Sequence, residues 1–552
     1  MRIRTCLGLL AAGALACAAT LPGAPAEAVP GSSLPVHGRL VVIPAESPGG
    51  ATSYAVALPD GDLVPVTGRF PAGVRTGAAF RGRLEVPSDV MRSMSARGES
   101  GSTAALRLVD RRSLALRVVG TPSITAPNVT AGASTVHAQF VAALDNVGTL
   151  GQTDPQLLGH VSAVGGYWAG QSGGTMSVTV PATVTHYDTT VSSTTCGLGP
   201  SGADFTAIVQ EAMGKFPGID PFGGTDQLVV FVPPSCYGGS TVGRGTIGSG
   251  FASGGVLVAE SSTSIEGVYA HEAGHNYGFQ HADARLSGAP LEYYGIYDVM
   301  GFAFGPPYTM LTALSTPYRV FQGITDPGEI QTVDLGDGHA AVHATATLAP
   351  RSSPTGVRSV RVKDPDTGEN LYLDYRSGTG QDSSSVYAAQ VSLLSGSSTI
   401  RYAPGVTINA ARGSNGNDTL VLDGSGHTSL SAGAHWKNAS GLLKVTVTAT
   451  SASGATVSVD YTPALVLKSS RPRIKGKAVV GHVLKARHGR WTSGTTFRYR
   501  WFADGKRIKH RTGKKLTLTK AQKGHRITVR VTGSKPGYAK VARASKRTPK
   551  VT

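Results

Sequence analysis

The chain has 552 residues, of which 16% are charged, and it contains 72 glycines. A single hydrophobic core is excluded at this length, so three or four domains are expected, and the many glycines predict short strands joined by turns. Beyond the N-terminal segment no apolar run approaches the ~18 residues of a transmembrane helix, so we expect no transmembrane segment.

Residues 1–28 have the features of a secretory signal peptide. Two arginines near the N-terminus precede a 15-residue, mostly apolar run, Leu7–Leu21, and Ala26–Glu27–Ala28 fits a cleavage site. Lipidation at Cys17 is the alternative, but the residues before it lack the branched side chain of a good lipidation site. We therefore expect a secreted, extracellular protein.

Residues 29–128 alternate short apolar runs with turns rich in glycine and proline, as in Gly38–Pro44 and Ala105–Val109. This pattern predicts a small all-β domain. The sequence leaves open whether the domain is a propeptide, removed on maturation, or a permanent accessory domain.

Residues 129–334 mix strands with helices. A capping threonine ahead of a proline in the first turn, Thr153–Asp154–Pro155, predicts a helix. A second helix is expected at Asp204–Phe216, and apolar runs predict strands at Thr135–Leu144, Thr175–Val180, Gln227–Val232 and Gly255–Ala259.

Only Cys196 and Cys236 remain outside the expected signal peptide. In an oxidising compartment the default is a disulfide between them. Zinc ligation by the two thiolates is the alternative. A cysteine-switch mechanism, in which a cysteine ahead of the catalytic domain keeps the enzyme latent, is not expected, because residues 29–128 contain no cysteine.

The most informative pattern is H-E-x-x-H-x-x-G-x-x-H at residues 271–281. On a helix, His271 and His275 share one face, while Glu272 lies about 100° away and therefore beside a bound ion. Gly278 can take a positive φ and end the helix, so that His281 returns as a third ligand. Three protein ligands with one open position are typical of catalytic zinc.

The residues before this motif support a helix. Thr263–Ser264–Ile265–Glu266 fits a capping box. Two histidines four residues apart are often unrelated, but Gly278 and His281 at their fixed offsets favour zinc. We therefore predict Zn²⁺ bound by His271, His275 and His281.

At this point the chain resembles the metzincin zinc peptidases. The resemblance implies a two-lobed catalytic domain with a Met-turn beneath the zinc ligands, and Met300 in Tyr297–Asp298–Val299–Met300–Gly301 matches its methionine. Leu314–Arg319 is similar to the helix that follows in the gametolysin-like branch. Some branches carry a tyrosine two residues after the methionine, where this chain has Phe302. A stabilising hydroxyl must then come from elsewhere, such as Tyr297 or Tyr308, or be absent.

Residues 335–463 return to short β runs, such as Leu371–Tyr375 and Ala455–Tyr461. In the second run the apolar residues fall on one face, and we predict a β-sandwich. Residues 413–420 approximate one calcium-binding nonapeptide repeat, but one copy cannot stack, so a hairpin turn is the favoured interpretation.

Residues 464–552 hold 26 of the 52 lysines and arginines and one acidic residue, Asp504. Cations alternate with large apolar residues, as in Thr496–Phe502 and Arg526–Val531, around Trp491 and Trp501. The segment resembles the immunoglobulin-like repeats of secreted actinobacterial proteins. Its charge predicts binding to an anionic polymer, first a cell-wall glycopolymer, then extracellular DNA or a glycosaminoglycan. A solubilising surface without a partner is the alternative.

These observations predict a multidomain α+β protein in which a metzincin catalytic domain is flanked by all-β domains. The expected function is a secreted zinc metalloendopeptidase that cleaves polypeptide substrates, with Glu272 as general base, retained at an anionic surface such as the cell wall. The alternative is a polyanion-binding adhesin with a vestigial peptidase domain. The expected domains are 1–28 (signal peptide), 29–128 (β domain), 129–334 (zinc peptidase), 335–463 (β-sandwich) and 464–552 (basic immunoglobulin-like domain).

Overall fold

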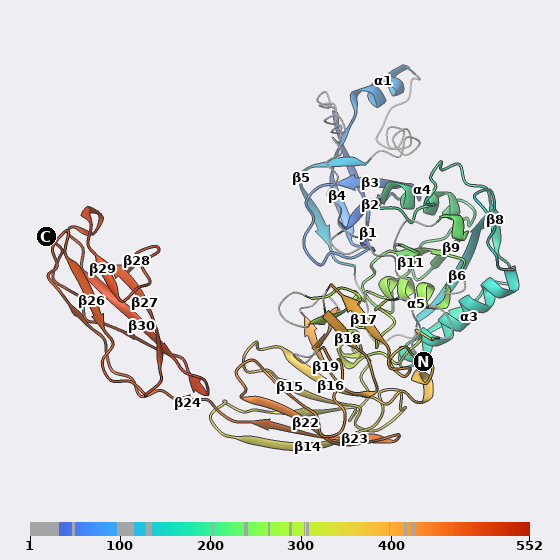
Figure 1. Cartoon of the computed structure of the whole chain (residues 1–552). Coiled ribbons are helices and arrows are strands. Elements are labelled where there is room, and N and C mark those ends of the chain that lie inside the picture. Colours follow the sequence, from blue (N-terminus) through green and yellow to red (C-terminus); the bar gives the residue numbers. More distant parts are fainter. Residues whose placement is uncertain are drawn as a thin grey trace, which may run out of the picture.

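The structure is a computed structural model of the whole chain and is a mixed α+β protein in which sheets predominate (Figure 1). It describes residues 32–46, 50–96, 115–127, 135–200, 202–236, 241–262, 265–285, 290–302, 304, 308–396, 398–412, 417–421 and 426–552. The predicted signal peptide and Thr263 of the predicted capping box lie outside these residues. None of the described helices is both long and apolar enough to cross a membrane.

The N-terminal part forms a closed barrel in the order β1-β2-β3-β5-β4. Its long first strand pairs with β4 through its first half and with β2 through its second half. Alternate side chains of the strands fill the interior, among them Leu40, Val56 and Phe80. A helix absent from the predicted all-β pattern precedes the last strand. The elements are β1 (Ser32–Ile43), β2 (Ser53–Ala57), β3 (Leu63–Thr67), β4 (Ala79–Val86), α1 (Ser88–Ala96) and β5 (Leu116–Thr125).

A second sheet has the order β10-β11-β9-β6-β7, and β8 also pairs with β6. Its strands are parallel except β10, an edge strand antiparallel to β11. Helices α3 and α5 pack on one face, while α4 and the barrel pack on the other. The elements are β6 (Thr135–Leu144), α3 (Asp154–Gln171), β7 (Met176–Thr179), β8 (Thr185–Tyr187), α4 (Gly202–Met213), β9 (Gln227–Val232), β10 (Gly243–Gly245), β11 (Gly255–Glu260) and α5 (Ile265–Asn276).

This arrangement explains the uninterrupted apolar strands. In β9 every side chain is buried, because helices cover one face of the parallel sheet and α4 with the barrel covers the other. The strands and helices predicted between residues 135 and 260 are found within a few residues of their expected ends. The helix after Thr153 begins with the capping box formed by Thr153 and Gln156.

Two further sheets pack face to face around a shared core that includes Leu373, Ile408 and Val457. The first has the order β12-β20-β19-β16-β15-β13 and the second β14-β23-β22-β21. A small hairpin, β17-β18, lies beside them. The elements are β12 (Ala282–Arg285), α6 (Thr316–Gln322), β13 (Ile330–Val333), β14 (Val342–Leu348), β15 (Ser359–Lys363), β16 (Asn370–Arg376), β17 (Ser392–Ser395), β18 (Ser398–Arg401), β19 (Gly405–Arg412), β20 (Asn417–Val421), β21 (His435–Lys437), β22 (Leu443–Ser451) and β23 (Gly454–Tyr461).

The sandwich begins earlier in the chain than its predicted start at residue 335. Strand β12 follows His281 directly and pairs in parallel with β20, and β13 pairs with β15. The boundary between residues 334 and 335 therefore cuts through one sheet. Strands β19 and β20 pair antiparallel, and residues 413–416 of the predicted hairpin turn lie outside the described residues.

The C-terminal part has its own core, formed by Trp501, Leu484, Val529 and their neighbours, and it lies apart from the rest of the chain (Figure 1). It consists of two short sheets, β25-β26-β29 and β28-β27-β30-β32, with β24 and β31 paired beside them. The strands are β24 (Leu465–Val466), β25 (Arg473–Lys475), β26 (Val483–Arg487), β27 (Thr496–Ala503), β28 (Lys506–Arg507), β29 (Lys515–Thr517), β30 (Ile527–Ser534), β31 (Tyr538–Ala539) and β32 (Val541–Ala544).

A buried ion pair connects the sandwich to the predicted Met-turn. Arg376, on β16, is fully buried, and its Nη2 lies 3.2 Å from Oδ2 of Asp298. The other oxygen of Asp298 accepts a hydrogen bond from the backbone N–H of Ser315 at 2.8 Å. The sandwich and the residues around Met300 therefore form one packed unit.

Substitution Arg376→Met is expected to lower the free energy of unfolding by roughly 3–5 kcal/mol, because it leaves the Asp298 carboxylate buried without its cation. Urea unfolding followed by tryptophan fluorescence measures the change. Arg361→Met on neighbouring β15 is the matched control, since its hydrogen bond to Thr332 is exposed to solvent. Equal midpoints for the two variants would contradict the expectation.

Candidate metal centre

Three histidine rings converge at the end of helix α5. The centroids of His271, His275 and His281 are 5.0–5.4 Å apart. His271 and His275 lie one helical turn apart on α5. Gly278 has a φ of +88°, which ends the helix and turns the chain back, so that His281 reaches the same space. The structure therefore brings together all three predicted ligands.

The Nδ1 atom of each ring faces a hydrogen-bond acceptor. Nδ1 of His271 lies 3.0 Å from the carbonyl of Val299, and Nδ1 of His275 lies 2.8 Å from that of Phe279. A carbonyl only accepts, so both rings carry a proton on Nδ1 and direct the Nε2 lone pair into the shared space. These two Nε2 atoms are buried and have no hydrogen-bond partner. Such atoms are suited to bind a cation.

The third ring has carboxylates on both sides. Nδ1 of His281 lies 2.8 Å from Oε1 of Glu292, and its Nε2 lies 3.3 Å from Oε2 of Glu46. Burial alone would lower the pKa of His281, but the hydrogen bonds to Glu292 and Glu46 outweigh it and raise the pKa to about 9. Burial, together with the charges of its two partner histidines, lowers the pKa of His271 to about 3. A bound metal would replace the proton on His281 Nε2.

Glu46 is a fourth member of this cluster, and the sequence interpretation missed it. Ligand atoms of Glu46 and the three histidines all lie within 4.8 Å of one another and could hold a metal ion. The carboxylate oxygens of Glu46 are 3.6 Å from Nε2 of His275 and 3.9 Å from Nε2 of His271. Its side chain is 5% exposed. Burial raises its pKa, but His275 and His281 outweigh burial and hold it well below the ordinary value.

Glu272 lies beside this cluster rather than in it, as the helical spacing predicts. Two glycines of edge strand β10 allow its close packing: a Cβ on Gly243 would stand 2.6 Å from Oε1 of Glu272, and one on Gly245 2.7 Å from the Glu272 carbonyl oxygen. Its Oε2 is buried and has no hydrogen-bond partner. Burial, and then the charge of Glu46, raises the pKa of Glu272 well above its ordinary value.

The predicted Met-turn lies against α5. Met300 is fully buried, and a Cβ on Gly274 would stand 2.3 Å from its sulfur, so only glycine leaves room for it on that face of the helix. Hydrogen bonds from the N–H of Gly301 to Asp298 and from that of Ala282 to Met300 close the turn. The carbonyl of Val299, one residue earlier, holds His271. The turn thus positions a histidine directly.

A tyrosine hydroxyl does lie beside the histidines, and it belongs to Tyr293 rather than to either tyrosine suggested by the sequence. The Tyr293 ring lies 4.0 Å from that of His281, and its hydroxyl donates to Oε2 of Glu46 at 3.0 Å. Burial, and then the charge of Glu46, raises its pKa well above the ordinary value, so the hydroxyl keeps its proton. The hydroxyl of Tyr297 is instead bound to Ala403 and Thr428 in the sandwich. Tyr308 packs against Phe304 in the same apolar cluster as Tyr297.

Cys196 and Cys236 form the predicted disulfide, with their Cα atoms 5.3 Å apart. Both are buried in the core between the sheet and α4. The thiolate zinc site is therefore excluded for this pair, and the crosslink stabilises the scaffold on the face opposite α5.

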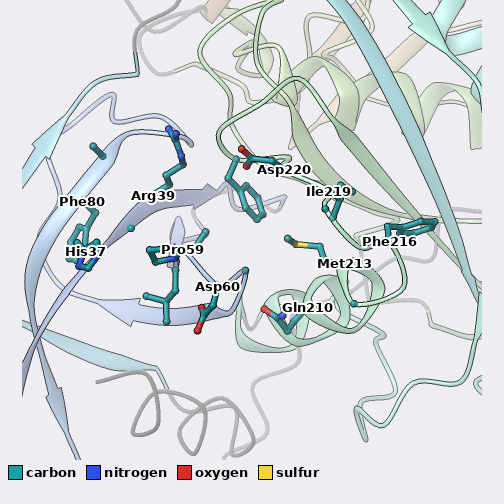
Figure 2. Close-up of a pocket in the computed structure, with 18 of the residues that line it drawn as sticks. His37, Arg39, Pro59, Asp60, Phe80, Gln210, Met213, Phe216, Ile219 and Asp220 are labelled. Carbon is teal, nitrogen blue, oxygen red and sulfur yellow. The ribbon is translucent and has the colours of Figure 1, made fainter. Parts of the chain in front are cut away.

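A cavity of about 850 Å³ lies between the barrel and the C-terminal end of α4 (Figure 2). In Figure 2, Pro59 and Asp60 of the barrel face Gln210 and Met213 of α4. None of the metal-cluster residues lines it. The cavity marks the junction between barrel and sheet rather than the site at the histidines.

No protein-family model matches the chain, and no curated protein matches its sequence. The site is defined by its own geometry. That geometry comprises three oriented imidazoles, an adjacent buried carboxylate that is not part of the cluster, and a tyrosine hydroxyl within the same space.

Proposed function

We propose that the protein is a secreted zinc endopeptidase of the metzincin type. The observation that carries the proposal is the pair of buried, unpartnered Nε2 atoms of His271 and His275, directed at one point that His281 also faces. Two of these nitrogen ligands come from successive turns of α5, and the third comes from the chain that follows the helix. Such a set suits zinc, which binds histidine readily and keeps an open position in catalytic sites.

A zinc ion bound there would supply Lewis acidity, lowering the pKa of a water molecule and polarising a carbonyl. The remaining chemistry belongs to the protein. Glu272 accepts the proton of the attacking water through its free Oε2 and passes it to the leaving amine. Tyr293 is the donor available to the oxygen on which negative charge develops.

Substrate binding is assigned to the edge strand. Among the strands that the structure describes, β10 pairs with β11 alone, and its residues Gly243 and Gly245 pack against Glu272. An extended peptide that pairs with such an edge places its backbone carbonyls beside the catalytic carboxylate. Side-chain pockets along that edge would then determine which peptides are cleaved.

The C-terminal part is proposed to retain the enzyme at an anionic polymer, with cell-wall glycopolymers as the first candidate. Arg500 on β27 stands directly opposite Arg530 on β30, and both are exposed. Like charges placed opposite each other destabilise a sheet. A polyanion lying across these strands would relieve that repulsion, which favours a binding surface over a merely solubilising one.

Zinc binding is the direct test of the proposed site. The full chain is expected to bind one zinc ion, and His275→Ala is expected to weaken binding by at least about 10–100-fold, the scale on which even supporting partners of a metal site act. Competition with a chromophoric chelator measures the affinity. His160→Ala is the control, because His160 lies on α3 and pairs with Glu266 away from the cluster. Equal zinc affinities for the two variants would contradict the site.

A further inference from the structure

We propose that Glu46 is a fourth, internal ligand of the metal site, so that the N-terminal barrel keeps the full chain in a latent state. The inference rests on the proposed function, because it assigns a role to Glu46 at the same zinc site. It also decides between the two roles left open for residues 29–128, in favour of an inhibitory propeptide.

The distances suit a shared ion. Tetrahedral zinc with bonds of about 2.0–2.2 Å sets its ligand atoms roughly 3.3–3.6 Å apart. Oε2 of Glu46 lies 3.3 Å from Nε2 of His281 and 3.9 Å from Nε2 of His271, and Oε1 lies 3.6 Å from Nε2 of His275. The carboxylate thus occupies the position that a fourth ligand would take.

A plain ion pair between Glu46 and His281 explains less of the geometry. It leaves Oε1 of Glu46 buried without a hydrogen-bond partner, together with Nε2 of His271 and of His275. An unsatisfied buried polar atom destabilises a fold, because it has lost its hydrogen bonds to water without gaining a partner. One metal ion would satisfy all three atoms at once, whereas without an ion Oε1 of Glu46 and Nε2 of His275 face each other at 3.6 Å, beyond hydrogen-bond distance.

The barrel holds Glu46 in place through a firm junction with the catalytic sheet. Glu46 lies three residues beyond the end of β1, in the connection to β2. Just before it, the carbonyl of Val42 accepts a hydrogen bond at 2.8 Å from the N–H of Ile247, and the Ile247 side chain packs in the barrel core. Val41 and Ile43, on the other face of β1, are buried in the core of the catalytic sheet.

Two working parts of the site are engaged by this one carboxylate. A catalytic zinc site needs an open position, whereas four protein ligands make a closed, structural site. The hydroxyl of Tyr293 also donates to Glu46, so it is not free for a substrate oxygen. Activation must therefore withdraw Glu46, and removal of the barrel by proteolysis is the route that the fold suggests.

The test uses the full chain loaded with zinc and compares the wild type with Glu46→Ala. The probe is acetohydroxamate, a small chelator that needs a free position on the metal. If the closed state predominates about 99:1, probe affinity is reduced about 100-fold, because apparent affinity scales with the competent fraction. Glu46→Ala is therefore expected to bind the probe about 100-fold more tightly in calorimetry.

A second readout is independent of activity and of the probe. Loss of a ligand is expected to weaken zinc binding by Glu46→Ala, by about 10–100-fold, in chelator competition. Glu46→Gln keeps the shape of the side chain and serves if the alanine variant folds poorly. The control is Glu85→Gln, which removes a carboxylate from β4 of the same barrel, where it pairs with exposed Arg117.

The outcomes separate the two proposals. If the wild type and both Glu46 variants bind the probe and zinc with equal affinities, Glu46 is not a ligand of the metal. The proposed zinc site itself would not be affected by that result. If neither the wild type nor any variant binds zinc, the proposed function itself is contradicted. Tighter probe binding by Glu46→Ala but not by Glu85→Gln is the result that supports an internal ligand.

Discussion

Substitution Glu272→Gln is expected to lower kcat/KM for peptide hydrolysis by about 10²–10⁴-fold, the usual contribution of a general base. It is made in a chain that also carries Glu46→Ala, so that the metal site is open to substrate. The glutamine has the size of the glutamate but cannot accept the proton of the attacking water. Cleavage of a quenched fluorescent peptide measures the rate. Zinc content is expected to stay unchanged, because Glu272 is not among the ligand atoms of the cluster.

Helix α5 offers a matched control in Glu266→Gln. Glu266 lies on the same helix, but its half-exposed carboxylate pairs with His160 at 3.0 Å, away from the histidine cluster. This variant is expected to retain full activity. If Glu272→Gln kept its rate while retaining zinc, Glu272 would not be the base, and the adhesin alternative with a vestigial site would gain support.

Removal of residues 464–552 is expected to abolish binding to anionic polymer. Half of the lysines and arginines of the chain lie in this part, with one acidic residue. A protein that neutralises roughly six to ten phosphates loses about 10³–10⁵-fold in affinity between 50 and 200 mM salt, because binding releases condensed counterions. We expect a dependence of this order for purified wall teichoic acid, measured by sedimentation with cell-wall material at several salt concentrations.

Residues 464–552 can be removed without cutting another hydrophobic core, because the C-terminal part has a core of its own. Zinc binding by the truncated chain serves as the control that the remaining residues are folded. Arg500→Gln combined with Arg530→Gln is a milder version that removes one facing pair of cations. Duplex DNA and heparin, tested in parallel, show whether the surface prefers one polymer. Binding that is independent of salt, or unchanged by truncation, would contradict retention by charge.

The histidine cluster was predictable where its geometry is local. Helical spacing places His271 and His275 on one face and Glu272 beside them, and a glycine that tolerates a positive φ allows His281 to return. Buried parallel strands carry a strong apolar signal, so Gln227–Val232 was found with its exact bounds. In each case the physical cause acts within a few residues of chain.

The remaining parts depend on contacts across the chain. Glu46 lies 235 residues from His281, and only docking of the barrel brings the two together. Tyr293 has a φ of +68°, which is uncommon for a tyrosine. No local sequence pattern predicts this backbone conformation. Strand β12 is four residues long and obtains its sheet partner, β20, from more than a hundred residues away.

The measurement that tests the central claim most directly is cleavage of casein by the zinc-loaded Glu46→Ala chain before and after chelation. We predict that internal peptide bonds are cleaved, that the activity disappears when the zinc is removed, and that it returns when zinc is added back. Activity that persists without metal, or a zinc-loaded chain that cleaves nothing, would contradict the assignment of the histidine cluster as a peptidase site.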